Sequence, residues 1–213
     1  MKKLVIIGHG DQGEIVKYLV MKSKKYHLLG FIDDEKKTDC LGRITDIPLL
    51  INKAGNFTVF IAIANNLVRS KIYLKLKKMD INCINIIHPC SIIEENVVLG
   101  NNVFIGANTI ININSKIDDG VYINTGCIIE HDNSIGSFSH LAPRVVTGGG
   151  VKIGDNSFIG LGSCLRNHIN LGKNTFVAMG SIVTHSYLQD NLALRGNPAK
   201  IFHSKKEIRN IYQ

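Results

Sequence analysis

The segments VVLGNNVFIG (residues 97–106) and VKIGDNSFIG (residues 151–160) decide the fold, because in both an aliphatic residue followed by glycine recurs after six residues. The same spacing runs through residues 87–183. Of the seventeen positions on it, sixteen are aliphatic and Thr147 is the exception. A period of six matches neither an α-helix, which repeats every 3.6 residues, nor a flat strand, which repeats every two.

This spacing predicts a triangular coil with three sides of six residues. Each side directs its aliphatic residue inward, and the residue two positions earlier is also inward and is small or β-branched, with Asn133 as the exception. Glycine, asparagine or aspartate allows the chain to bend at the corners. One buried aliphatic side chain contributes about 1.5–3 kcal/mol, whereas ordering six residues costs about 6–12 kcal/mol. Coils must therefore stack, and we expect a parallel β-helix over residues 87–190 whose flat outer faces suit self-association.

Residues 1–86 follow a different pattern, in which apolar strands alternate with helical spacing. This alternation predicts a small parallel sheet of Rossmann type. The expected strands cover residues 3–7, 27–32, 58–63 and 82–87, and the expected helices cover residues 14–22 and 66–78. Residues 191–213 lose the six-residue period and form a C-terminal tail, with a short helix expected at 204–212.

Composition narrows the function further. The formal charge of +8 divides into +7 for residues 1–86, −3 for residues 87–194 and +4 for residues 195–213, which does not resemble a stripe that binds nucleic acid. No apolar run is long enough to span a bilayer, and the first apolar run is too short for an export signal. The five cysteines form no CxxC pair, so we expect neither a zinc site nor disulfides, and a cytoplasmic location.

The first motif is G-x-G-x-x-G at residues 8–13, directly after a strand and at the start of a helix. Backbone amides in such a turn form a site for a phosphate or pyrophosphate. Asp33-Asp34 and Ala64-Asn65 follow the next two strands, at the edge where open α/β sheets bind ligands. The alternative interpretations are a solvated turn for the acidic pair and a helix N-cap for Asn65.

The second motif is Glu130-His131-Asp132-Asn133. A histidine held in one tautomer by a carboxylate is the usual general base for activating an amine or hydroxyl. The alternative is an outward histidine that only contacts water. His140 lies nine residues later, half a coil away, so it reaches the same site only if the coil's edge or a neighbouring subunit brings it there.

Two further segments suit a thioester co-substrate with phosphates. Residues 147–150, Thr-Gly-Gly-Gly, expose backbone N–H groups that can bind an oxyanion, unless they form only a loose turn. Arg195 and Lys200 flank a Gly-Asn-Pro turn and could receive a phosphate, unless this segment is only a chain-terminating turn with solvated charges. We interpret His9, His88, His168, His185 and Cys127 as structural or surface residues, because none has a second ligand at metal spacing.

Together these motifs resemble the hexapeptide-repeat acyltransferases, in the subgroup with a Rossmann-like N-terminal domain. That subgroup includes sialic-acid O-acetyltransferases, the bacillosamine-pathway N-acetyltransferase and enzymes acting on other nucleotide-linked 4-amino-4,6-dideoxysugars. The resemblance covers nearly the whole chain. Its segments are GHGDQG (8–13), FIDD (31–34), IAIANN (61–66), INTGCIIEHDNSIG (123–136), FSHLAP (138–143), the hexads and GNPAK (196–200).

The resemblance implies a left-handed β-helix that forms a homotrimer, with acetyl-CoA between adjacent coils and active sites at subunit interfaces. His131 matches the general base and Asp132 the carboxylate that orients it. The residues that match acetyl-CoA contacts are His140, Gly149, Leu161 and Met179, and Lys200 stands at the expected phosphate position. The residues that match the nucleotide-sugar site are Gly10, Asp11, Gln12, Asp33, Asp34, Ala64 and Asn65.

The expected function is therefore acetyl-CoA-dependent N-acetylation of the 4-amino group of a nucleotide-linked 4-amino-4,6-dideoxysugar, without a metal, in surface polysaccharide or glycan biosynthesis. The alternatives are O-acetylation of a sialic-acid-like sugar and a non-catalytic scaffold that binds nucleotide sugars. The sequence departs from the family at Asp132, where relatives often have glutamate, and at Ala64, where they have glycine. The first departure leaves open whether Asp132 contacts His131 directly or through water.

Overall fold

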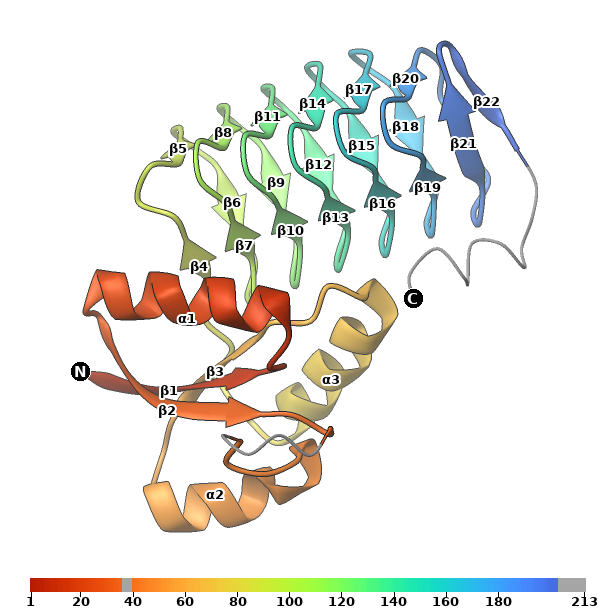
Figure 1. Ribbon diagram of the computed structural model, residues 1–213. Helices are drawn as coiled ribbons and strands as arrows, with labels where there is room; N and C mark the ends of the chain where they lie inside the picture. Colours follow the sequence, from red (N-terminus) through yellow and green to blue (C-terminus); the bar gives the residue numbers. More distant parts are fainter. Residues whose placement is uncertain (36–39, 203–213) are drawn as a thin grey trace. The chain divides into compact units, whose positions relative to one another are not determined.

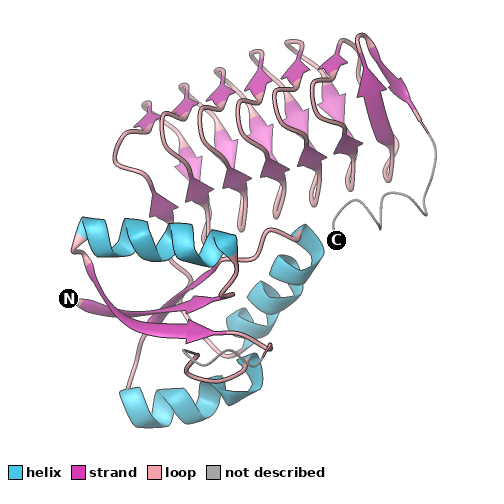
Figure 2. Ribbon diagram, viewed as in Figure 1, coloured by secondary structure: helices cyan, strands magenta, loops and turns pink. Residues whose placement is uncertain are grey.

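The computed structural model describes residues 1–35 and 40–202, and the chain divides into two compact units, Met1–Ile86 and Ile87–Gln213 (Figure 1). Within the described residues, all helices belong to the first unit, and the second consists of short strands and turns (Figure 2). None of the helices in the described part is long and apolar enough to cross a membrane. The helix expected at residues 204–212 lies outside the described residues.

The N-terminal unit contains the predicted parallel sheet. Its strands are β1 (Lys2–Ile7), β2 (Tyr26–Ile32) and β3 (Thr58–Ile61), in the order β2-β1-β3. The helix α1 (Asp11–Ser23) contacts β1 and β2, and α3 (Asn66–Lys78) contacts β3. The apolar residues of β1 and β3 are buried, as are Phe31 and Ile32 at the end of β2, and the predicted Rossmann-type alternation is confirmed.

Two elements of this unit differ from expectation. A 3₁₀ turn, η1 (Ile44–Asp46), leads into a helix that the sequence analysis missed, α2 (Ile47–Ala54). The strand expected at 82–87 is not continuous. Residues 82–84 pair with β3 through Val59 alone, and Ile86–Ile87 forms β4, which joins the β-helix.

The second unit is a parallel β-helix with eighteen residues per coil. Each coil contributes a two-residue strand to each of three faces, and a residue pairs with the residue eighteen positions later, as Tyr122 does with His140. The chain therefore stacks on itself with one register up to β20, and in the last coil the offset shortens, so that Phe176 pairs with Ala193.

The three faces are distinct sheets. The first face consists of β4, β7 (Phe104–Ile105), β10 (Tyr122–Ile123), β13 (His140–Leu141), β16 (Phe158–Ile159), β19 (Phe176–Val177), β21 (Ala193–Gly196) and β22 (Ala199–Ile201). The second face consists of β5 (Ile92–Ile93), β8 (Ile110–Ile111), β11 (Ile128–Ile129), β14 (Val146–Thr147), β17 (Cys164–Leu165) and β20 (Ile182–Val183). The third face consists of β6 (Val98–Leu99), β9 (Lys116–Ile117), β12 (Ser134–Ile135), β15 (Lys152–Ile153) and β18 (Asn170–Leu171).

The core of the β-helix is the predicted aliphatic row. From Ile105 to Val183 every member of that row is buried. The small polar residues two positions earlier are also buried, and most of their hydroxyl groups donate to carbonyl groups of the next coil, as Ser139 Oγ does to the Gly154 oxygen at 2.9 Å, whereas Thr175 Oγ1 donates within its own coil and Ser181 Oγ accepts from the Gly196 N–H. Their hydroxyl groups therefore occupy the core without a lost hydrogen bond.

The corners are made by single residues with positive φ, most of them asparagine or glycine, at intervals of six. The glycine that follows the aliphatic residue was predicted to let the chain bend at a corner, but its role in the structure is different. It does not have positive φ, but it lies against the next coil: a Cβ at Gly160 would be 2.5 Å from the Met179 nitrogen, and one at Gly106 would be 2.6 Å from the Thr125 nitrogen. These glycines allow adjacent coils to approach closely.

The last described residues form a hairpin on the first face. β21 continues the parallel pairing with β19, and β22 returns antiparallel to β21, with Arg195 opposite Lys200. The Gly-Asn-Pro turn at residues 196–198 is thus the tip of this hairpin.

Truncation of the aliphatic row should destabilise the β-helix far more than truncation of an outer side chain. Leu141 is fully buried and Val98 is 59% exposed. We expect Leu141→Ala to cost about 2–5 kcal/mol of unfolding free energy, and Val98→Ala to change it by less than about 0.5 kcal/mol. Urea unfolding followed by circular dichroism measures both, and equal midpoints for the two variants would contradict the assigned core.

Candidate active site

A histidine–aspartate pair lies at the corner between the second and third faces. His131 Nδ1 is 2.7 Å from Asp132 Oδ2, and both side chains are about half exposed. Because a carboxylate only accepts hydrogen bonds, Nδ1 carries the proton and the lone pair of Nε2 is available. Asp132, although shorter than glutamate, therefore reaches His131 directly.

Asparagines of the two preceding coils support Asp132. Asn114 Nδ2 donates to Asp132 Oδ1 at 3.3 Å, and Asn96 Nδ2 donates to Asn114 Oδ1 at 3.3 Å. The hydrogen bond from His131 is the main factor that lowers the pKa of the Asp132 carboxyl. The carboxylate consequently keeps its charge at pH values where an ordinary aspartate begins to be protonated.

Gly149 lies against the His131 ring. A Cβ at this position would be 2.5 Å from His131 Nε2, so a larger residue would displace the ring. In the described part of the chain the Gly149 N–H donates to no other group, whereas the Gly148 and Gly150 N–H groups both bind carbonyl oxygens. An available base and an available N–H donor therefore lie together at this corner, as acyl transfer requires.

Asn133 links the two parts of this corner from inside the core. Its Nδ2 donates to the carbonyl oxygens of Glu130 at 2.7 Å, His131 at 3.3 Å and Gly148 at 2.9 Å. Serines at equivalent positions reach only the next coil in this way. The longer side chain of Asn133 also holds the turn that carries His131.

Both interruptions of the core pattern lie in this region. Thr147 and Asn133 are at most 1% exposed, and neither Thr147 Oγ1 nor Asn133 Oδ1 has a hydrogen-bond partner in the described part of the chain. Thr147 pairs with Ile129, two residues before His131. Both departures from the repeat, Asn133 and Thr147, are visible in the sequence, but no role was predicted for Asn133.

His140 occupies a different face. It belongs to β13 on the first face, is 8% exposed, and accepts a hydrogen bond from Asn124 Nδ2 at 3.0 Å. Its ring lies between Tyr122 and Phe158, with centroid separations of 5.7 Å and 5.2 Å. The structure therefore does not bring His140 to the corner of the same chain that carries His131.

Leu161 and Met179 lie at the opposite edge of the second face, between the first and second faces. They are 48% and 74% exposed. Each precedes a glycine with positive φ, Gly162 or Gly180, where an added Cβ would meet nothing within 4 Å. This corner offers an open strip with accessible backbone. Lys200 is exposed on β22 and follows Leu161 and Met179 by more than one coil of sequence.

In the N-terminal unit, the Gly-rich turn joins β1 to α1. The N-cap Gly10 gives the helix no side-chain cap, and a Cβ at Gly13 would be 2.2 Å from the Gly8 oxygen. Gln12 Nε2 is buried and has no hydrogen-bond partner among the described residues. Together with Asp11, this turn presents uncapped helix N–H groups, the arrangement that binds phosphate in related folds.

The remaining predicted residues lie at the same edge of the sheet and also have local structural roles. Asp33 Oδ2 accepts from the His9 N–H at 2.7 Å, and Asp34 Oδ1 accepts from the Ile44 N–H at 3.0 Å. Asn65 is the N-cap of α3. The structure thus confirms the capping role of Asn65, and it places both acids in ordered turns.

Sequence reasoning missed Arg69. This fully buried arginine donates from Nη1 to the Ile63 and Ala64 oxygens at 2.8 and 2.9 Å, and from Nη2 to Asn66 Oδ1. These hydrogen bonds hold the turn between β3 and α3 in place. Its position in an otherwise polar helical segment gave no signal of burial.

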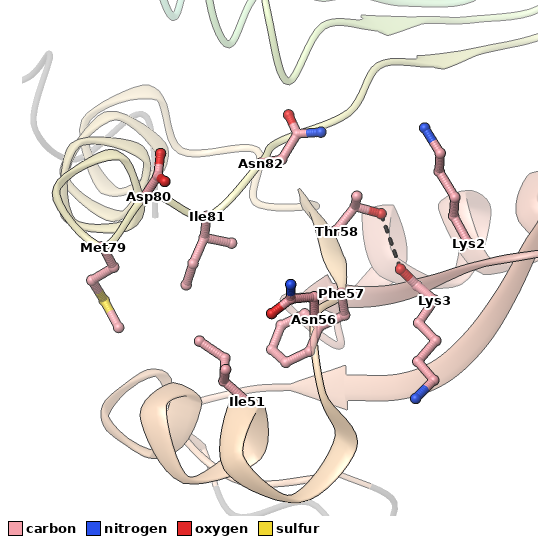
Figure 3. Close-up of a pocket in the computed structure, with 10 residues that line it drawn as sticks. All are labelled: Lys2, Lys3, Ile51, Asn56, Phe57, Thr58, Met79, Asp80, Ile81 and Asn82. Atoms are coloured by element: carbon pink, nitrogen blue, oxygen red, sulfur yellow. Dashed lines mark hydrogen bonds between the residues drawn. The ribbon is translucent and has the colours of Figure 1, made fainter.

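A cavity of about 560 Å³ lies at the opposite, amino-terminal edge of the sheet (Figure 3). Lys2, Thr58, Met79, Asp80 and Asn82 are among the residues that line it. It does not include the Gly-rich turn or the acidic pair. Among the described residues, no group of three or more histidine, cysteine, aspartate or glutamate side chains is placed to hold a metal ion.

Comparison with known proteins gives two family matches. Residues 3–76 match the PglD N-terminal domain, and residues 150–185 match the hexapeptide repeat of succinyl-transferase. UDP-N-acetylbacillosamine N-acetyltransferase of Bacillus subtilis is 30% identical over 109 residues, which are 47% of this chain and 49% of that protein. The chain thus matches about half the length of this curated relative.

Solved structures match nearly the whole chain. PerB from Caulobacter crescentus, in complex with CoA and GDP-perosamine, is 30% identical, with a TM-score of 0.89 over 95% of this chain and 98% of that one. The acetyltransferase domain of PglB from Neisseria gonorrhoeae, in complex with acetyl coenzyme A, is 26% identical, with a TM-score of 0.86 over 94% and 99%. These likenesses confirm the expected α/β domain followed by a left-handed β-helix. The chain belongs to the hexapeptide-repeat sugar acetyltransferases that carry a PglD-type N-terminal domain.

Proposed function

We propose that this protein is an acetyl-CoA-dependent N-acetyltransferase acting on the 4-amino group of a nucleotide-linked 4-amino-4,6-dideoxysugar, in surface polysaccharide or glycan biosynthesis. The observation that carries the proposal is the His131–Asp132 pair, whose Nε2 lies against Gly149, a residue whose N–H binds no carbonyl oxygen in the described part of the chain. The CoA and GDP-perosamine bound to PerB support the two substrate classes. The five free cysteines support a cytoplasmic location.

The chemistry follows from the protonation state of His131. Nε2 accepts a proton from the attacking amine as its nitrogen bonds to the acetyl carbonyl carbon, and Asp132 stabilises the resulting imidazolium. The Gly149 N–H donates to the carbonyl oxygen as it gains negative charge. The imidazolium then returns the proton to the departing CoA sulfur. Asn133 keeps the two groups at a fixed separation throughout.

The acetyl-CoA contacts are proposed at both edges of the second face. The open strip at Leu161 and Met179 suits an extended pantetheine chain hydrogen-bonded to backbone, and Lys200 is proposed to contact a phosphate. His140 is proposed to contact the acetyl group of a neighbouring subunit's site. Gly10, Asp11, Gln12, Asp33, Asp34, Ala64 and Asn65 are proposed to hold the nucleotide sugar in the N-terminal unit.

A homotrimer is proposed for two reasons. Each face has six residues per coil, about 15–20 Å, so the strip at Leu161 and the base at His131 lie too far apart in one chain to share a thioester. A second copy that covers the second face would bring one corner of each chain together. The outward row of that face is apolar and partly exposed, and consists of Ile92, Ile110, Ile128, Val146, Cys164 and Ile182.

The substrate assignment predicts thiol release from acetyl-CoA when a GDP-, UDP- or dTDP-linked 4-aminosugar is present. Ellman's reagent follows the thiol, and mass spectrometry locates the acetyl group on nitrogen. Release only with a hydroxyl acceptor of sialic-acid type would support O-acetylation instead. No release with any amino or hydroxyl acceptor would leave the scaffold interpretation.

Replacement of the base should abolish turnover without abolishing co-substrate binding. We expect His131→Ala to lower kcat by about 10²–10⁴-fold, since proton transfer to the base is lost, while calorimetry shows acetyl-CoA still bound. His185→Ala is the matched control, because His185 is exposed at the same corner three coils later. If the two variants had equal kcat, His131 would not be the base.

Association through the second face predicts that a charge in its apolar row disrupts the trimer. Ile110→Lys should yield a monomer in size-exclusion chromatography with light scattering, because burial of an unpaired lysine is costly. Ser134→Lys, at the equivalent outward position of the third face, should remain trimeric. A trimeric Ile110→Lys variant would rule out this face as the interface.

A further inference from the structure

In the N-terminal unit, a histidine of the Gly-rich turn lies between a cysteine and a glutamate. Cys40 Sγ is 3.6 Å from His9 Nδ1, and His9 Nε2 is 3.0 Å from Glu14 Oε1. His9 precedes α1 and Glu14 lies in the first turn of α1, whereas Cys40 comes from a segment beside β2. A nucleophile, a base and an orienting carboxylate in this order form the arrangement that activates catalytic cysteines.

The backbone fixes both the thiol and the ring against Phe31. The His9 N–H is bound by Asp33, and the His9 ring stacks on Phe31 with a centroid distance of 4.0 Å and an interplanar angle of 13°. The backbone of Cys40 forms an isolated parallel β-bridge with Phe31, and the Leu41 N–H donates to the Phe31 oxygen at 2.7 Å. The His9 ring and the backbone of Cys40 are therefore both held at Phe31, which keeps the thiol within reach of the imidazole.

The hydrogen bonds also set the tautomer of His9. Because Glu14 can only accept, Nε2 carries the proton and Nδ1 presents its lone pair to the Cys40 thiol. Burial alone would raise the pKa of Glu14, but hydrogen bonds from Lys17 and His9 lower it, so the carboxylate is charged at neutral pH. A charged carboxylate on one side of the imidazole favours transfer of the thiol proton to the other side.

We propose that Cys40 is a nucleophilic thiol and a modification site for small peroxides. His9 Nδ1 takes the thiol proton, and the thiolate sulfur attacks one oxygen of hydrogen peroxide. The oxygen–oxygen bond breaks, and the departing hydroxide takes the proton from His9. The products are a Cys40 sulfenic acid and water, so sulfur is oxidised and peroxide is reduced. This inference does not depend on the acetyl-transfer proposal.

The other cysteines provide internal controls. Cys90 and Cys164 are exposed, and neither sulfur is hydrogen-bonded to an imidazole in the described part of the chain. Cys127 is buried, and this burial raises the pKa of its thiol to about 11. If the half-buried Cys40 reacts faster than two exposed thiols, solvent access cannot explain the difference, and chemical activation of the thiol does.

The test measures iodoacetamide alkylation of the intact protein at neutral pH, with peptide mass spectrometry for each cysteine. We expect Cys40 to react at least about tenfold faster than Cys90 and Cys164, because thiolate formed by proton transfer to His9 is the reactive species. Hydrogen peroxide followed by dimedone should label Cys40 and leave the two exposed cysteines unlabelled. Equal alkylation rates, or no dimedone adduct at Cys40, would overturn the proposal.

The variant His9→Phe isolates the base. Phenylalanine can still stack on Phe31 but accepts no proton, so the Cys40 rate should fall to that of Cys90. Buried Cys127 must remain unreactive in the variant, which shows that the β-helix is still folded, and circular dichroism checks the helices of the N-terminal unit. An unchanged Cys40 rate in a folded His9→Phe variant would refute activation by His9.

Discussion

The backbone pairing of each coil with the coil eighteen residues later is the constraint on which the β-helix depends. The Ile128 N–H donates to the Val145 oxygen at 2.9 Å, and the Gly148 N–H donates to the Leu165 oxygen at 2.8 Å. Because one register runs through the coils from β4 to β20, residues eighteen apart in them lie beside each other whatever their chemistry. The juxtaposition of His131 with Gly149 is a direct consequence of this register.

The same register couples bulky residues at the corners to glycines. A Cβ at Gly120 would be 2.3 Å from the Phe138 ring, and one at Gly150 would be 2.6 Å from His168 Nδ1. Each large side chain occupies the space that its neighbour in the column leaves free. A side chain at Gly120 or Gly150 would therefore collide with its neighbour in the column, and Gly149 and Gly150 each lie against an imidazole ring, that of His131 or His168.

The fold could be predicted from sequence because its period is six and is unlike that of helices or flat strands. The pairing of His131 with Asp132 could also be predicted from their adjacency, but whether the contact is direct or through water could not, and the structure gives 2.7 Å between Nδ1 and Oδ2. The position of His140 was only partly accessible: nine residues is half a coil, which indicates another face but not burial between Tyr122 and Phe158. The helix α2 was missed because a run of only eight residues carries little periodic signal.

The buried role of Asn133 lay beyond sequence reasoning, because its three acceptors are backbone oxygens on two different coils. Burying Asn133 nevertheless has a cost in stability. An unpaired buried polar atom costs about 1–3 kcal/mol, and Asn133 Oδ1 and Thr147 Oγ1 are both in that position. Sixteen aliphatic positions elsewhere in the row can offset such a cost. A smaller residue at 133 could still reach the next coil as serine does, but it would release the turn that carries His131, so the extra length of asparagine is explained by the fixed separation between His131 and Gly149.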